Sequence, residues 1–196
     1  MNTENAVLKQ MAKESLKGKW GLAVGTYMVY FVILLGVQMI PKGSPFVALI
    51  IGGPFVLGIS VFSLAISRNK DARLEQIFEG FNNFGKALGA YLLMLLFILL
   101  WMLLLIIPGI IAGISYSMTF FILADEPAIG AMEALDKSKK MMDGYKLKYF
   151  YLGLSFIGWA LLCLLTLGIG FLWLIPYAQV SMAKFYDDIK EKPSLV

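Results

Sequence analysis

Few side chains in this sequence could carry out catalysis. Its 196 residues include no histidine, which is the commonest general base and metal ligand in proteins. The single cysteine, Cys163, lies in an apolar run far from any charge that would activate its thiol. Glu75 and Glu79 are four residues apart and Asp187 and Asp188 are adjacent, but exposed carboxylates of this kind usually contact only water and nearby lysine. We therefore predict no catalytic residue, no metal site and no cofactor.

Hydroxyl and amide side chains gather in three apolar segments. The residues concerned are Ser60, Ser63, Ser115, Ser117, Thr119, Tyr177, Gln179 and Ser181. On one interpretation the hydroxyls bond back to their own helix, while small residues permit close helix packing. On the other, the three segments face one another and line a polar crevice that holds a lipid headgroup or a peptide. The sequence leaves both interpretations open.

The segments that carry these side chains have the composition of a membrane protein. The chain is 59% hydrophobic and 15% charged, whereas soluble domains are about 45–50% apolar and about 25% charged. Residues 87–124 contain no charge and are about twice too long for one crossing of a hydrocarbon core roughly 30 Å thick. Pro108-Gly109 lies near their middle, so we predict a hairpin that turns there.

Two other apolar blocks also read as hairpins, so we predict six transmembrane helices. The first covers residues 20–67 and is broken at 41–45, and the last covers 149–183 with a turn at 166–170. A short amphipathic helix is expected before each hairpin, at the membrane surface. In the second of these, an α-helix would place Leu74, Ile77, Phe78 and Phe81 on one apolar face, directed toward lipid or the bundle.

The same order of elements occurs three times, and a glycine elbow joins each amphipathic helix to its hairpin. The elbows are Gly18, Gly85 and Gly144. We therefore predict a single integral membrane domain over residues 1–196, with internal repeats at about 4–67, 72–124 and 128–184. Because each repeat contains two crossings, all three would have the same orientation.

Lysine and arginine residues set that orientation. Of the 17 basic residues, all but Lys42 fall on one side of the predicted hairpins. The basic side of a membrane protein faces the cytoplasm. We therefore expect a multi-pass protein of the bacterial plasma membrane, with both termini and all three amphipathic helices in the cytoplasm.

Several stretches resemble a known family. FNNFGKALG (81–89), IIPGIIAGISYSMTFFILAD (106–125), EALDKSK (133–139) and TLGIGFLWLIPY (166–177) are similar to a family of bacterial integral membrane proteins, domain of unknown function nine-seven-five, seen mostly in Gram-positive bacteria. That family is distantly similar to the membrane domain of glycerophosphodiester phosphodiesterases. The resemblance implies a membrane protein and transfers no catalytic residue, since nothing in this chain matches the phosphodiesterase catalytic domain.

These observations predict an all-α membrane protein without enzymatic activity. We expect a membrane-embedded binding or scaffold protein that contacts lipid, anionic on the cytoplasmic face, or another membrane protein. Nucleic-acid binding is not expected, because no basic stripe or motif supports it. The alternative is a carrier or channel for a small, peptide-like or lipid-like substrate. It is the second choice because the apolar blocks lack the ionisable residues that ion-coupled carriers usually hold within the bilayer.

Overall fold

The computed structural model describes residues 3–39 and 44–190, and this part of the chain is all-helical, as predicted. The elements in order are α1 (Asn5–Leu16), α2 (Trp20–Gln38), α3 (Ser44–Ser67), η1 (Leu74–Asn83), α4 (Phe84–Leu104), α5 (Ile106–Ser115), α6 (Thr119–Asp125), α7 (Ala131–Met141), α8 (Lys146–Leu154), α9 (Ile157–Leu165) and α10 (Phe171–Lys190). Lys42 and most of the predicted first turn at 41–45 lie outside the described residues.

Five helical stretches of the described chain are long and apolar enough to cross a membrane. They are Trp20–Gln38, Pro45–Ser67, Leu74–Leu104, Ile106–Asp125 and Lys146–Leu165. The sixth predicted helix, α10, is not among them, because charged residues occupy it from Lys184 onward. Its uncharged part, residues 171–183, is about 20 Å long as a helix, which is less than the core thickness of roughly 30 Å. The structure therefore supports a membrane-spanning protein without establishing six full crossings.

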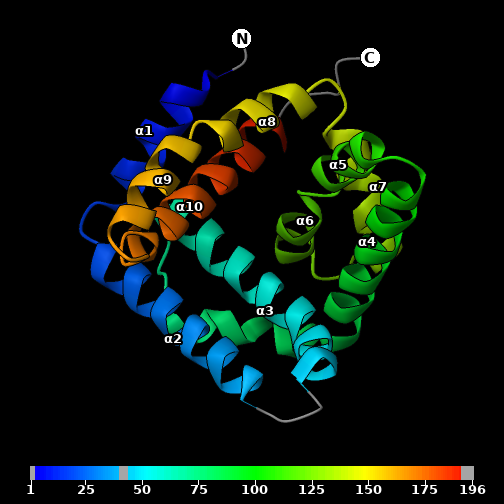
Figure 1. The fold of residues 1–196 in the computed structure, drawn as a ribbon, viewed down its shortest axis with the longest axis horizontal. Coiled ribbons are helices and arrows are strands. Elements are labelled where there is room, and N and C mark those ends of the chain that lie inside the picture. The colour runs from blue at the N-terminus through cyan, green and yellow to red at the C-terminus, as the bar shows by residue number, and fades with distance from the viewer. Residues whose placement is uncertain (1–2, 40–43, 191–196) are drawn as a thin grey trace.

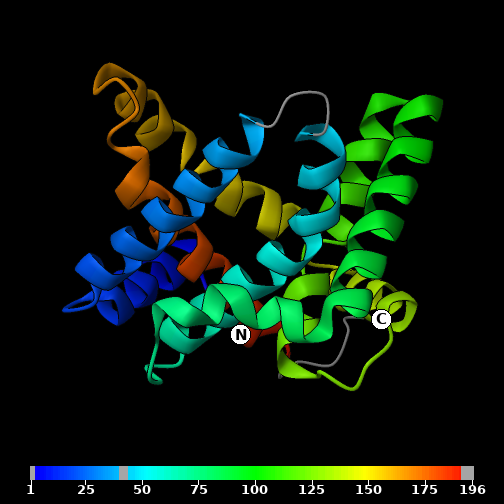
Figure 2. The ribbon, with the colours of Figure 1, turned by 90° about the horizontal axis from the view of Figure 1, so that it is seen from below.

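Two of the helical hairpins point the same way. In Figure 2 the α4–α5 connection (green) and the α9–α10 connection (gold to orange) lie at one side of the molecule, which we call the tip side. Helices α1 and η1 lie at the opposite side, which we call the polar side. The turn predicted at 166–170 is found between α9 and α10. The turn predicted at Pro108-Gly109 lies instead at Leu105, because proline suits the first turn of a helix and so belongs to α5.

The second amphipathic element is a 3₁₀ helix, so the predicted α-helical face was wrong in detail. A 3₁₀ helix has about three residues per turn, which brings Ile77 and Gly80 onto the buried side and leaves Phe78 42% exposed. Leu74 and Phe81 are half-buried. The rings of Phe78 and Phe81 both contact Phe55 of α3, with centroids 5.9 and 5.1 Å away.

Phe78→Asp tests the placement of this element. We expect the substitution to destabilise the protein by about 1–3 kcal/mol, because the carboxylate would replace a ring that packs on Phe55 at an apolar boundary. Protease protection and membrane yield should both fall. The control is Glu79→Asp at the exposed neighbouring residue, where no change is expected. Equal protection of Phe78→Asp and wild type would contradict the placement.

The two ends of the chain pack against each other on the polar side. Helix α1 lies beside α10 (Figure 1) and buries Leu8, Ala12 and Leu16 there and against α3. The side-chain amide of Asn5 donates a hydrogen bond of 2.9 Å to the carbonyl oxygen of Lys148. The hydroxyl of Thr3 donates to the carboxylate of Asp188 in α10. Helix α1 is therefore an integral part of the bundle as well as a surface element.

Candidate functional site

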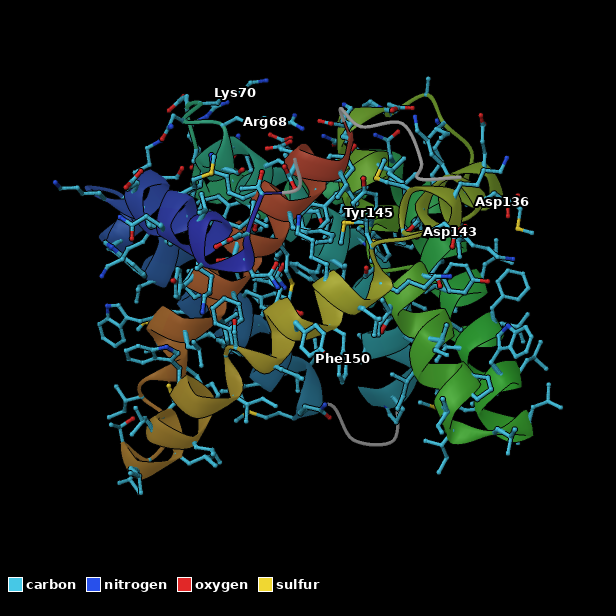
Figure 3. The ribbon with its side chains drawn as sticks, turned by 90° about the horizontal axis from the view of Figure 1, so that it is seen from above. Arg68, Lys70, Asp136, Asp143, Tyr145 and Phe150 are labelled. Atoms are coloured by element: carbon cyan, nitrogen blue, oxygen red, sulfur yellow. The ribbon has the colours of Figure 1, made fainter. Side chains whose placement is uncertain are left out.

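The second helices of the three hairpins meet at their polar ends. Arg68 directly follows α3, Asp125 ends α6, and Asp187 lies in the last turns of α10. The Arg68 guanidinium binds both carboxylate oxygens of Asp125, at 2.5 and 2.7 Å. It also donates to one oxygen of Asp187, at 2.7 and 3.1 Å. Figure 3 shows Arg68 on the polar side, away from the hairpin tips. One arginine thus joins all three hairpins.

Further polar groups complete this arrangement. Lys190 and the hydroxyl of Tyr186 donate to Asp125 at 2.6 and 3.1 Å. The hydroxyl of Ser67 donates to Asp187 at 3.0 Å, and Lys184 donates to the Ser67 carbonyl oxygen. We call this set the central ion cluster; it comprises Ser67, Arg68, Asp125, Lys184, Tyr186, Asp187 and Lys190. The Asp125 side chain is only 9% exposed, so its charge depends on these partners.

The electrostatics of the cluster favour fixed charges over proton transfer. The pKa of Arg68 is raised, chiefly because its guanidinium donates to Asp125. Burial is the main reason that the pKa of Lys184 is lowered and that of Tyr186 is raised. Arg68 therefore remains charged and Tyr186 neutral across the physiological range. Such a network can hold helices together and set their relative positions.

A cavity of about 200 Å³ lies beside the cluster, toward η1. Its polar lining residues are Arg68, Lys70, Asp71, Gln76 and Asp125. The two basic and two acidic side chains balance, so the cavity offers no net charge to a ligand. A second ion pair, Lys148 with Asp188 at 2.8 Å, joins α8 to α10 nearby.

Sequence reasoning missed the central ion cluster. The sequence predicts only contacts with water and lysine for Asp187 and only a role in orientation for Arg68, and the predicted central hairpin ends before Asp125. A usable signal existed, because Arg68, Asp125 and Lys184 each follow the uncharged second half of a predicted hairpin. Equivalent positions in three repeats around one axis would be expected to converge.

Four of the eight residues predicted for a polar crevice have local partners. The hydroxyls of Ser60, Ser115 and Ser181 each donate to the carbonyl oxygen four residues earlier. Ser117 donates to the carbonyl three residues earlier. This is the geometry expected from the packing interpretation.

The other four predicted crevice residues are held differently. The hydroxyls of Ser63 and Tyr27 are 3.3 Å apart, and the buried hydroxyl of Thr119 has no hydrogen-bond partner among the described residues. The ring of Tyr177 lies edge-on to Phe156, and Gln179 is half-buried. Ser115 and Tyr177 line two separate cavities. A shared crevice that holds a ligand stays a prediction.

Comparison with known proteins gives one result. A family model described as "Protein of unknown function (DUF975)" matches residues 1–111 and residues 102–193. Two matches of one model within one chain hint at an internal repeat, although they mark two segments and not three. No curated protein and no solved structure matches the chain. The distant similarity to phosphodiesterase membrane domains is not among these findings.

Proposed function

This chain belongs to the DUF975 family of proteins of unknown function, and we propose that it is a non-enzymatic, multi-pass membrane protein that binds lipid or scaffolds another membrane protein. The observation that carries the proposal is the internal pairing of the central ion cluster. Arg68 connects acids from two other hairpins, and Lys190 and Tyr186 bind the same Asp125. Because these groups are already bound to one another, they fix the positions of the three hairpins relative to one another.

The polar side supports contact with anionic lipid. Lys13 on α1, Lys17 directly after α1 and Lys139 on α7 are exposed there. Basic side chains at the edge of apolar helices are attracted to anionic headgroups. The apolar helix faces and tips suit the lipid interior, with Leu103, Leu104 and Leu105 all more than two-thirds exposed.

A carrier or channel is the second candidate. The observation that favours it is the cavity of about 200 Å³ beside Arg68 and Asp125, because an arginine and an acid next to an open space can bind a polar solute. It ranks second because both side chains are already paired with each other.

Reporter fusions test the membrane topology in this proposal, which has both termini in the cytoplasm. We expect fusions after Arg73 and Asp143 to report the cytoplasm and fusions at Gly168 to report the outside, because basic residues concentrate near the first two positions. A fusion at Lys70 is the control for Arg73. A cytoplasmic signal at Gly168 would contradict the topology.

Native mass spectrometry of the purified protein tests the binding role. Under the proposal, anionic lipid or a defined membrane protein stays attached after repeated detergent exchange. Turnover or flux of a solute in reconstituted vesicles would instead favour the carrier. A bare protein with neither retained partner nor flux would contradict both candidates.

A further inference from the structure

An apolar cavity lies between the first and third hairpins. Its volume is about 420 Å³, and Lys13 stands at its edge. The other residues that define it include Trp20 of α2, Trp159 and Cys163 of α9, and Trp173, Leu174 and Tyr177 of α10. We call this space the large cleft. Three tryptophans and a tyrosine make its wall aromatic, which suits an apolar chain.

The large cleft adjoins a second, basic space. A cavity of about 440 Å³ is lined by Gln10, Lys13, Glu14, Lys17 and Trp20, so it shares Lys13 and Trp20 with the large cleft. No described residue forms an ion pair with Lys13 or Lys17, whereas Glu14 accepts a hydrogen bond of 2.9 Å from Gln10. The apolar large cleft therefore continues into a space whose lining carries an excess of positive charge.

A smaller cavity of about 200 Å³ lies at the boundary between the second and third hairpins. We call it the small cleft, and its lining includes Trp101, Pro108, Ile111, Tyr116, Lys139 and Lys146. Like the large cleft, it combines an apolar and aromatic wall with lysine. The two clefts thus have the same chemistry at two different places in the molecule.

The two clefts are built from equivalent positions of the internal repeat. Gly18 and Gly144 are the elbows before α2 and α8, with φ of +79° and +77°. Lys13 and Lys139 each stand five residues before the elbow, and Trp20 and Lys146 each stand two residues after it. All four line a cleft. Because the same positions of the repeat line a cleft twice, the cleft is a feature of the repeated fold.

The boundary between the first and second hairpins lacks the side chains that line the two clefts. Gly80 and Ala87 occupy the same positions relative to Gly85. A Cβ at Gly80 would lie 1.9 Å from the Pro54 carbonyl oxygen, and a Cβ at Gly53 would lie 2.5 Å from the Ala87 carbonyl oxygen. The first and second hairpins therefore touch backbone to backbone. Small residues close this boundary, whereas lysine and aromatic residues accompany the two open ones.

We propose that the large cleft binds one anionic phospholipid of the surrounding bilayer, and that the small cleft is a second, equivalent site. The phosphate lies at Lys13 and Lys17, and an acyl chain lies along Trp159, Trp173 and Tyr177. An apolar slot at membrane depth favours an acyl chain over water, since methylene burial is favourable there. The ammonium groups add a charge-assisted contact to phosphate. This inference rests on the membrane location in the proposed function and names its ligand.

The four tryptophans of the chain allow each cleft to be observed separately. Trp20, Trp159 and Trp173 line the large cleft and Trp101 lines the small one. In the Trp101→Phe variant of the full-length protein, fluorescence reports only the large cleft. The protein is reconstituted in phosphatidylcholine bilayers, and phosphatidylglycerol with brominated acyl chains is added as the quencher. Brominated phosphatidylcholine is the comparison quencher.

We expect phosphatidylglycerol to quench with an apparent association about fivefold or more above that of phosphatidylcholine, since each lysine near an anionic headgroup is worth about that factor. In the Lys13→Ala/Lys17→Ala variant the preference should fall to about onefold. The control is Lys140→Ala, an exposed lysine of α7 that lines neither cleft. The control should keep the preference and the unfolding midpoint of the parent.

Lipid binding in the small cleft can be tested independently through the fluorescence of Trp101. A variant with Trp20, Trp159 and Trp173 replaced by phenylalanine reports through Trp101 alone. There, Lys139→Ala should reduce the preference for phosphatidylglycerol, while Lys13→Ala should not. If the triple replacement fails to fold, Trp101→Phe still tests the large cleft.

Three outcomes would overturn the proposal. Equal quenching by both brominated lipids would indicate only bulk lipid contact. Quenching by neither would indicate that a protein segment covers the cleft. A preference that survives Lys13→Ala/Lys17→Ala would mean that the headgroup lies elsewhere. Each can occur in a protein with the expected topology and with retained lipid, so this inference can fail while the proposed function stands.

Discussion

Gly80→Ala is expected to lower the free energy of unfolding by about 3 kcal/mol, because a methyl group there cannot fit between η1 and α3. Its carbon would lie 1.9 Å from the carbonyl oxygen of Pro54, which is backbone and cannot rotate away. The two elements would have to separate, and fully buried Ile77 would lose its packing. For a protein of this size, the unfolding midpoint in detergent should fall by about 6–12 °C.

The matched control is Gly85→Ala, five residues later in α4. No heavy atom lies within 4 Å of a Cβ placed there, so alanine should stabilise the helix by about 0.5–1 kcal/mol. Gly58→Ala, whose Cβ would lie 2.0 Å from the Ile77 carbonyl oxygen, should reproduce the loss from the opposite side of the contact. An unchanged midpoint for Gly80→Ala would mean that the hairpins are not in direct backbone contact.

Asp125→Ala is expected to destabilise the protein by about 2–4 kcal/mol, since it removes the acid shared by Arg68, Lys190 and Tyr186. The Asp125 side chain is 9% exposed, whereas Arg68 and Lys190 are 25% and 40% exposed. Water can therefore reach the two bases after the acid is gone, which keeps the loss below that of a fully buried pair. The unfolding midpoint measures the effect.

A double-mutant cycle separates the ion pair from simple loss of packing. Arg68→Ala alone should also destabilise the protein, and the double variant should cost about 1–3 kcal/mol less than the two single losses together, because each single variant leaves a charge without its partner. Asp136→Ala, at an exposed position of α7, is the control and should change little. Strict additivity of Arg68→Ala and Asp125→Ala would argue against a coupled cluster.

The helical architecture could be predicted from charge and length, whereas its local geometry could not. Uncharged runs as long as 87–124 predict helices that are long and apolar enough to cross a membrane, and the structure has such helices. The 3₁₀ geometry of η1 could not be predicted, because the spacing of Leu74 and Ile77 fits both a three-residue and a 3.6-residue period. Only the contact of Gly80 with α3, which joins residues far apart in sequence, distinguishes the two.

The candidate site was less predictable for a related reason. Arg68 and Asp125 are separated by 57 residues, and their pairing requires that two hairpins end at the same depth. Nothing in the local sequence of Asp187 distinguishes a paired acid from a solvated one. Serine back-bonding, in contrast, depends only on neighbouring residues, which is why one of the two interpretations already described the hydroxyls of Ser60 and Ser115.

The packing of α1 against α10 affects the protein while it is still being made. The two helices are separated by most of the chain, so at about 5–20 residues per second α1 leaves the ribosome roughly 10–30 s before α10 is complete. Throughout that time Leu8, Ala12 and Leu16 lack their final partner. A chain that stops early keeps this apolar surface exposed, which marks it for proteolysis. The burial of the first helix is thus complete only once α10 has docked.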